Sequence, residues 1–207
     1  MTELLLDRVE SGIGTLLLVC NGTRLCALGF GDDDYATLHS VRARYGSVSF
    51  RATDDPAEIT SRIRAYFAGE YAALDAIAVE TGGTPFQREV WAALREIPPG
   101  TTISYGELAR QIGRPRATRA VGLTNGLNPI AVVVPCHRVI GADASLTGYG
   151  GGLHRKRWLL EHEGLRVHDG VKVGRSDQLA FGGLAAIVSS RIVVRSLAYR
   201  RARGVSS

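Results

Sequence analysis

The glycine pair in Glu80-Thr81-Gly82-Gly83 divides this chain of 207 residues into two differently patterned halves, which limits the folds open to it. Before it, apolar runs at 4–9, 14–20, 24–30 and near 47–51 predict short strands, and Asn21-Gly22 predicts a two-residue hairpin turn. Helices fit at 34–45 and 56–69, the second with Pro56 in its first turn and Gly69 at its end. Residues 1–80 are therefore predicted to form a small α+β domain.

The second half is predicted to be mainly helical. Thr84-Pro85-Phe86-Gln87 has the capping-box pattern of a helix start, and Pro98-Pro99-Gly100 ends the segment. A last helix is expected at about Leu153 to Glu163, with Gly164 after it. The core face of the first helix is predicted to contain Phe86, Val90, Leu94 and Ile97, and that of the last helix Trp158, Leu159 and Leu160.

Two short helices between these predict a helix-turn-helix. Ser104-Tyr105-Gly106-Glu107 opens the first, which Gly113 ends, and the second follows Pro115 towards Asn125-Gly126. The small residues Ala117, Ala120 and Gly122 could let the second helix approach a DNA groove closely, or could serve packing between helices. Arginines gather at the junction of the two helices: Arg110, Arg114, Arg116 and Arg119.

The chemistry of the chain centres on Pro135-Cys136-His137-Arg138, which follows the apolar run 130–134, itself expected to be a strand. The reactive form of cysteine is the thiolate, and neighbouring cations or a histidine lower the thiol pKa. Cys136 is therefore the candidate nucleophile, although a cysteine ending an apolar strand can also be an inert core residue.

No metal or cofactor is expected. Cys20 and Cys26 are interpreted as packed strand residues, because no CxxC or Cys/His ligand spacing accompanies them. The glycine-rich segment 147–152 has neither the GxGxxG context of a dinucleotide site nor the Gly-Lys-Ser/Thr of a phosphate loop. It could offer backbone N–H groups to a ligand or simply connect two elements.

Charge is unevenly distributed. Residues 1–84 carry 7 Lys or Arg and 12 Asp or Glu, residues 85–164 carry 10 and 6, and residues 165–207 carry 8 and 2. A basic middle block fits a DNA-facing domain, although solvated surface charge explains it equally well. An odd number of cysteines, no signal peptide and no apolar run long enough for a membrane span predict a cytoplasmic protein, nucleoid-associated if bacterial.

Several separated motifs resemble one known family in correct order. They are the Pro-Cys-His-Arg motif, Asn128-Pro129, Tyr105-Gly106, Arg119-Ala120-Val121-Gly122, Thr147-Gly148-Tyr149 and Trp158-Leu159-Leu160. Residues 82–164 thereby resemble the C-terminal domain of O6-alkylguanine-DNA alkyltransferases, and residues 1–80, less specifically, their ribonuclease-H-like N-terminal domain. The implied fold is α+β with a winged-helix-like second domain over 81–164.

The resemblance implies a DNA-repair reaction. The family binds duplex DNA in the minor groove as a monomer, flips the damaged base out, and moves the alkyl group from guanine O6, or from thymine O4, irreversibly to the residue matching Cys136. His137 would act as its base through a water molecule, Glu163 would orient His137, and Asn128 would be the hinge.

The remaining implied roles concern the base and the DNA. Tyr105 would help to rotate the nucleotide and support proton transfer, and Arg119 would fill the space left in the base stack. Tyr149 would line the alkyl pocket, while the backbone of Val139 and Gly150 would read the guanine edge. Some relatives have a serine where this chain has Gly150, so the resemblance does not predict the shape of the alkyl pocket. The DNA-binding helix would contribute Ala117, Thr118, Ala120 and Gly122.

Two other functions stay open on the residues alone: a lesion-binding protein without catalysis, and a cysteine hydrolase or acyltransferase. The segment 165–207 departs from the family and is basic, with Arg200-Arg201-Ala202-Arg203 near its end. It is interpreted as a solvated or disordered extension, or as an arm that adds phosphate contacts to DNA.

Overall fold

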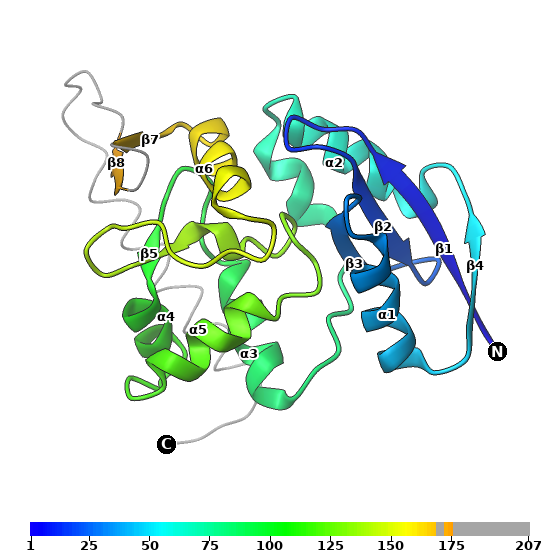
Figure 1. The fold of residues 1–207 in the computed structure, drawn as a ribbon, viewed down its shortest axis with the longest axis horizontal. Coiled ribbons are helices and arrows are strands. Elements are labelled where there is room, and N and C mark those ends of the chain that lie inside the picture. The colour runs from blue at the N-terminus through cyan, green and yellow to red at the C-terminus, as the bar shows by residue number, and fades with distance from the viewer. Residues whose placement is uncertain (169–171, 176–207) are drawn as a thin grey trace. The chain divides into compact units, whose positions relative to one another are not determined.

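The computed structural model describes residues 1–168 and 172–175, and its N-terminal part is built on a four-stranded sheet in the order β3-β2-β1-β4 (Figure 1). β1 (Thr2–Val9), β2 (Leu16–Cys20) and β3 (Leu25–Phe30) pair antiparallel, and β4 (Val48–Ala52) runs parallel to β1. All four strands lie where the apolar runs predict them.

The turn between β2 and β3 is longer than the predicted two-residue turn. It runs from Asn21 to Arg24, whose carbonyl accepts a hydrogen bond from the Asn21 N–H at 3.1 Å. The Asn21 side chain accepts from the backbone N–H groups of Thr23 at 3.2 Å and Arg24 at 2.9 Å. This asparagine stabilises the wider turn with its own side chain, which explains why the Asn-Gly rule was wrong here.

Helices cover both faces of the sheet, and β2 is buried along its whole length. On one face, Val19 packs with Val41 of α1 (Asp34–Tyr45). On the other, Leu16 and Leu18 pack with residues of α2 (Ile59–Phe67). The helix predicted over 56–69 begins as a 3-10 turn, η1 (Pro56–Glu58), because positive φ angles at positions 55, 57 and 58 delay the α-helix to Ile59.

The segment that divides the two halves, Glu80-Thr81-Gly82-Gly83, is bound to the N-terminal part through its first residues. After η2 (Tyr71–Ala76), Val79 forms a bridge with Leu25, and the Glu80 carboxylate accepts hydrogen bonds from Tyr45 and Asn21. The Arg44 guanidinium donates to the Thr81 carbonyl at 2.7 Å. The bend itself is confined to the glycines at 82 and 83, whose φ angles are 63° and 79°.

Short helices form the C-terminal part, and both predicted capping boxes are present. Thr84 caps α3, whose regular turns end at Leu94, before the predicted stop at Pro98, although Ile97 is still buried. The elements in chain order are α3 (Pro85–Leu94), β5 (Ile103–Ser104), α4 (Tyr105–Gln111), α5 (Thr118–Gly126), η3 (Cys136–Arg138), β6 (Val139–Ile140) and α6 (Leu153–His162).

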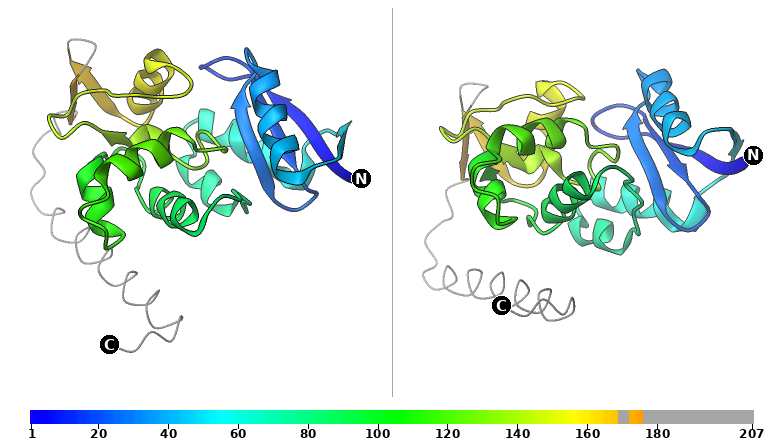
Figure 2. Two further views of the ribbon diagram at one scale, coloured as in Figure 1. Left: turned by 60° about the horizontal axis from the view of Figure 1, so that its bottom comes forward. Right: turned by 90° about the horizontal axis from the view of Figure 1, so that it is seen from below.

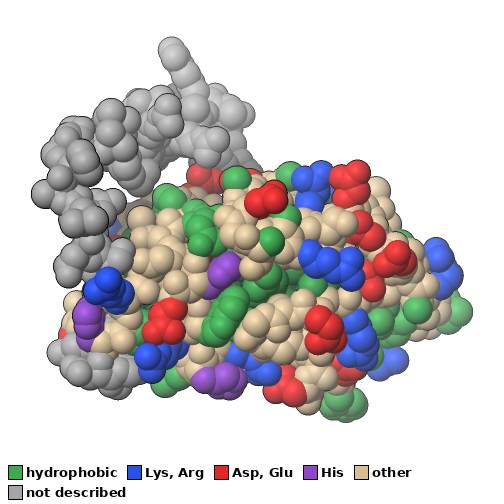
Figure 3. All heavy atoms as spheres, turned by 90° about the horizontal axis from the view of Figure 1, so that it is seen from above, with side chains coloured by type: hydrophobic (Ala, Val, Ile, Leu, Met, Phe, Trp, Pro, Cys, Tyr) green, Lys and Arg blue, Asp and Glu red, His purple; other side chains and the backbone are tan. Residues whose placement is uncertain are grey.

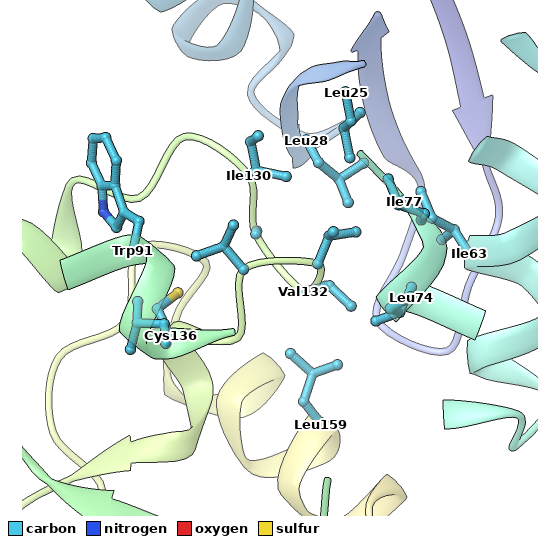
Figure 4. Packing of buried hydrophobic residues seen from close by; sticks show 14 of the residues in the cluster. Leu25, Leu28, Ile63, Leu74, Ile77, Trp91, Ile130, Val132, Cys136 and Leu159 are labelled. Carbon is cyan, nitrogen blue, oxygen red and sulfur yellow. The ribbon is translucent and has the colours of Figure 1, made fainter. Parts of the chain in front are cut away.

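One apolar core joins the two halves. Ile130 forms a bridge with Leu28 of β3, and the Val132 side chain lies between the residues of the N-terminal part and Leu159 of α6 (Figure 4). Cys136 lies at one edge of this cluster, and Trp91 of α3 lies at the same edge. The sheet and the helices thus share the packing that surrounds the candidate nucleophile.

Residues beyond α6 are described only in part. β7 (Leu165–His168) and β8 (Lys172–Arg175) pair antiparallel, so the first residues of the predicted extension are folded. The basic cluster at 200–203 lies outside the described residues. Among the helices that the structure describes, none is long and apolar enough to cross a membrane.

Candidate active site

Cys136 begins η3 rather than ending a strand. The segment 130–134 forms a bridge at Ile130 followed by turns, and Val132 has a φ of 67°. A β-branched residue in this left-handed region is strained and persists only when its surroundings fix it. The predicted strand over 130–134 is therefore wrong, because side-chain hydrogen bonds and burial of Val132 override the β propensity of this apolar run.

Asn128 supplies those hydrogen bonds. Its amide nitrogen donates to the Val134 carbonyl at 2.7 Å and to the Cys136 sulfur at 3.1 Å, and its amide oxygen accepts from the Ile130 N–H at 3.0 Å. From α5, Asn125 donates to the Cys136 carbonyl at 3.3 Å. Two asparagines thereby fix the loop and the thiol, and the sequence singled out only Asn128.

The thiol is buried, and its sequence neighbours do not activate it directly. Cys136 is 6% exposed, and burial raises its pKa, with the Asn128 hydrogen bond and the charge of Lys156 only partly offsetting that effect. The sequence-based expectation that adjacent cationic side chains lower this pKa is wrong. Arg138 instead binds Glu163, so its charge is already neutralised by a carboxylate.

His137 and Glu163 meet as expected, although 26 positions separate them in the chain. The His137 Nε2 atom lies 3.0 Å from Glu163 Oε1, and both side chains are buried. Burial lowers the pKa of His137, and Glu163 opposes the shift. His137 is therefore neutral near neutral pH, with Nε2–H donating to the carboxylate and Nδ1, which has no hydrogen-bond partner among the described residues, keeping its lone pair.

Glu163 is held by more groups than sequence reasoning found. Arg138 donates to both of its oxygens, from Nη2 to Oε1 at 2.8 Å and from Nε to Oε2 at 3.0 Å. The Tyr66 hydroxyl donates to Oε1 at 2.8 Å, and the Gly100 N–H to Oε2 at 3.4 Å. Burial alone would raise the Glu163 pKa, but His137 and Arg138 outweigh it and hold that pKa well below 4.5.

Lys156 is another member of the site that was not predicted from the sequence. Its ammonium group is buried and donates to the carbonyls of Val139 at 2.6 Å and Thr147 at 2.7 Å. Burial lowers its pKa to about 8, an effect that Cys136 partly opposes. The sequence held one signal for its burial: Lys156 lies one helical turn before Leu159 and Leu160, which were predicted to face the core. Through these two hydrogen bonds Lys156 connects β6, which follows the nucleophile, with the loop 147–152.

In the loop 147–152, Tyr149 is half-buried and packs against the core, whereas Gly150 is exposed. The Tyr149 hydroxyl is buried without a hydrogen-bond partner among the described residues, and its ring packs edge-on against Phe30 at 6.1 Å. Burial raises the Tyr149 pKa, so the phenol stays protonated. A side chain added at Gly150 would meet nothing within 4 Å, so glycine is not required there for space.

Tyr105 lies at the start of α4, immediately after the capping residue Ser104. Its hydroxyl accepts a hydrogen bond from Thr147 at 3.4 Å, and its ring is the nearest neighbour of Gly122 on α5. An open pocket of about 550 Å³ adjoins it, with Arg110, Thr118 and Ile140 among its lining residues. A Cβ added at Gly122 would make an ordinary van der Waals contact with the Tyr105 ring at 3.7 Å, so packing of the two helices does not require glycine here.

The other predicted DNA-binding residues lie on the exposed side of α5. Thr118, Arg119 and Ala120 are exposed, and Ala117 is half-buried. Arg119 makes no ion pair within the described part of the chain, whereas Arg114 pairs with Glu89 at 2.9 Å. α4 and α5 lie side by side on the side of the molecule seen from below in Figure 2.

The opposite side of the molecule is the one seen from above in Figure 3. Figure 3 shows acidic and basic side chains interspersed on that side, with apolar side chains between them. In the described ranges 1–168 and 172–175, no group of three or more His, Cys, Asp or Glu side chains could hold a metal ion. Cys20 and Cys26 are free and buried, as predicted for packed strand residues.

Two family models match successive parts of the chain. Residues 6–81 match the ribonuclease-like domain of 6-O-methylguanine DNA methyltransferase, and residues 85–165 match the DNA binding domain of the same protein. The α+β class, with a ribonuclease-like first part and a helical second part, is confirmed.

Similar proteins and solved structures agree with these matches. A methylated-DNA–protein-cysteine methyltransferase of Salmonella typhimurium is 47% identical over 167 residues, which cover 79% of this chain and 98% of that protein. One of Mycolicibacterium paratuberculosis is 50% identical over 160 residues, covering 75% and 89%. The crystal structure of Mycobacterium tuberculosis O6-methylguanine methyltransferase has a TM-score of 0.65 at 43% identity, covering 79% of this chain and 93% of that one. The chain therefore belongs to the methylated-DNA–protein-cysteine methyltransferase family.

Proposed function

We propose that this protein repairs DNA by moving the alkyl group of O6-alkylguanine to its own Cys136, once per molecule. The observation that carries the proposal is the site itself: a buried thiol that accepts a hydrogen bond from Asn128, in a turn that also contains the His137–Glu163 pair. A nucleophile, a base and a group that orients the base are the components of an activated cysteine. Membership of the methyltransferase family supplies the reaction class.

Residues 81–164 are proposed to bind duplex DNA from the minor-groove side, through α5. The structure of M. tuberculosis OGT in complex with DNA, which matches this chain with a TM-score of 0.64 at 43% identity, supports DNA as the partner. Residues 1–80 would be the supporting ribonuclease-like domain and 165–207 the basic extension. We further propose that the protein acts as a monomer in the cytoplasm.

The target base has to leave the duplex, because guanine O6 lies on the major-groove edge of the base pair, the proposed approach is from the minor groove, and Cys136 is buried. Arg119 is exposed on α5 and free to enter the stack in place of the extruded base. Tyr105, beside the pocket at the start of α4, would contact the rotating nucleotide and support proton transfer to guanine. The backbone of Val139 and Gly150 would contact the guanine edge, and Tyr149 the alkyl group.

The chemical step exchanges one bond for another. His137 accepts the Cys136 proton at Nδ1 through a bridging water molecule, with Glu163 stabilising the imidazolium that forms. The thiolate sulfur then forms a bond to the alkyl carbon while the bond between that carbon and O6 breaks, and guanine leaves with the electron pair and takes up a proton. The products are S-alkylcysteine and unmodified guanine. O4-alkylthymine would react in the same way as a second substrate.

The experiment is a stoichiometric titration. Duplex DNA containing O6-methylguanine is supplied in excess, and restored guanine is counted per protein molecule. The account predicts a plateau at one restored guanine, and none for Cys136→Ser. Continued turnover would indicate a hydrolase, and lesion binding with no restored guanine would indicate a protein that only recognises the lesion.

A further inference from the structure

The buried side chains that meet the His137–Glu163 pair include one from the N-terminal part of the chain. Tyr66 belongs to α2 and is 0% exposed. Its hydroxyl donates to Glu163 Oε1 at 2.8 Å, the same oxygen that lies 3.0 Å from His137 Nε2. A single carboxylate oxygen therefore connects the candidate base to α2.

We infer that Tyr66 is a positioning residue, through which the N-terminal part sets the basicity of His137. The inference rests on the proposed function, because it needs His137 to act as the base for Cys136. Hydrogen bonds to a carboxylate compete for its charge. Since the Tyr66 hydroxyl draws charge from Oε1, less of that charge remains to stabilise the protonated imidazole.

Two observations favour this role over simple packing. The Tyr66 ring already has apolar partners in the core and aromatic neighbours at Phe67 and Tyr71. Packing therefore does not require the hydroxyl, since the ring of a phenylalanine would fill the same space. The carboxylate would still keep Arg138 and His137 as donors without it, so satisfying Glu163 does not require Tyr66.

The other charged groups around the pair are fixed by their own contacts. Arg138 binds both oxygens of Glu163 and the carbonyl of Ile97, and Lys156 binds two backbone carbonyls. Both lower the pKa of His137, after the larger effect of burial. Tyr149 and Cys136 complete the titratable surroundings and are protonated at neutral pH, because burial raises the pKa of each. None of these contacts involves the Tyr66 hydroxyl.

The variant Tyr66→Phe tests the inference, and Tyr71→Phe is its matched control. The Tyr71 hydroxyl lies in the same aromatic cluster but donates to the His162 carbonyl and makes no hydrogen bond to Glu163. Glu163→Gln is unsuitable, because it would leave the buried Arg138 guanidinium without a counter-charge. Both tyrosine variants keep the ring and remove one hydroxyl.

The readout is the rate of Cys136 alkylation by free O6-benzylguanine as a function of pH, which requires no DNA binding. In Tyr66→Phe the carboxylate holds the imidazolium more strongly, so the acidic limb should move to higher pH by about half a unit. At a fixed pH on that limb the rate should fall about threefold. The imidazole NMR signal of His137 should titrate at a correspondingly higher pH.

The two proposals fail in different ways. A wild-type protein that gains no alkyl group on Cys136 contradicts the proposed function. If the wild-type protein reacts but Tyr66→Phe keeps the wild-type pH profile and His137 titration, Tyr66 is only structural and the inference is wrong. An equal shift in Tyr71→Phe would also overturn it, because the effect would then come from packing in the aromatic cluster.

Discussion

At the scale of single residues, the site combines groups whose environments work against their chemistry. Burial raises the pKa of Cys136 and lowers that of His137, so the thiol and the imidazole are both neutral in the resting protein. A neutral pair avoids separating charges in a site of low dielectric. Forming the thiolate therefore requires a proton to move from Cys136 to His137.

Arg119 is the residue whose role depends most on the DNA being double-stranded. Replacing it with alanine should slow repair of duplex O6-methylguanine roughly tenfold or more, because base extrusion costs a few kcal/mol that the inserted side chain offsets. Reaction with free O6-benzylguanine should not change. The measurement compares the two alkylation rates in the same variant.

The control for this prediction is Arg116→Ala, which removes the same charge from an exposed position just before α5. Loss of a phosphate contact alone weakens binding through counterion release and reduces its salt dependence. Equal losses in the two variants, or equal losses of Arg119→Ala on both substrates, would refute an intercalating role.

At the scale of elements, the helices and strands that were predicted correctly are those marked by local sequence signals. Both capping boxes and the four strands were predicted correctly, because a cap or an alternating pattern acts within a few residues. The turn after Asn128 was not, since its shape depends on an asparagine side chain and on the burial of Val132. Lys156 and Tyr66 were missed as members of the site, and the pairing of Arg138 with Glu163 was missed, because the partners are distant in the chain.

The caps offer a test of how an element positions the site. Ser104→Ala and Thr84→Ala each remove a capping hydrogen bond and should each lower the free energy of unfolding by about 1 kcal/mol. Only Ser104 precedes Tyr105, so only its replacement should also slow alkylation by duplex DNA. Urea denaturation and the alkylation rate of both variants check this, and equal rates would show that the start of α4 does not position Tyr105.

At the scale of the whole molecule, the core and the site are continuous. Tyr66 and Phe30 reach from the N-terminal part to Glu163 and Tyr149, and the bridge between Leu28 and Ile130 joins the sheet to the loop before the nucleophile. Stability and reactivity should therefore depend on some of the same groups. The two halves seen in the sequence are two patterns of secondary structure within one packed core.

This shared dependence predicts how stability changes with pH. The pKa of His137 is lower in the folded protein than its ordinary value of 6.5, so the unfolded chain binds that proton first and stability falls as pH decreases below 6.5. The Glu163 pKa is also lowered, so stability falls again below 4.5. Each group should contribute up to about 1.4 kcal/mol per pH unit within its own window.

Urea denaturation at a series of pH values measures this dependence. His137→Gln should remove the fall that begins near 6.5 and leave the one below 4.5 in place. If the stability of the wild-type protein stays constant or increases as the pH is lowered from 6.5 to 4.5, the assignment of His137 as a buried neutral group is contradicted.

The most direct test of the account is the location of the transferred alkyl group. After reaction with duplex DNA containing O6-methylguanine, peptide mass spectrometry can examine Cys20, Cys26 and Cys136 separately. The account predicts a mass gain of one CH2 group on the peptide containing Cys136, in proportion to the guanine restored, and none on the other two. Repair with Cys136 unmodified, or with the methyl group on Cys20 or Cys26, would contradict it.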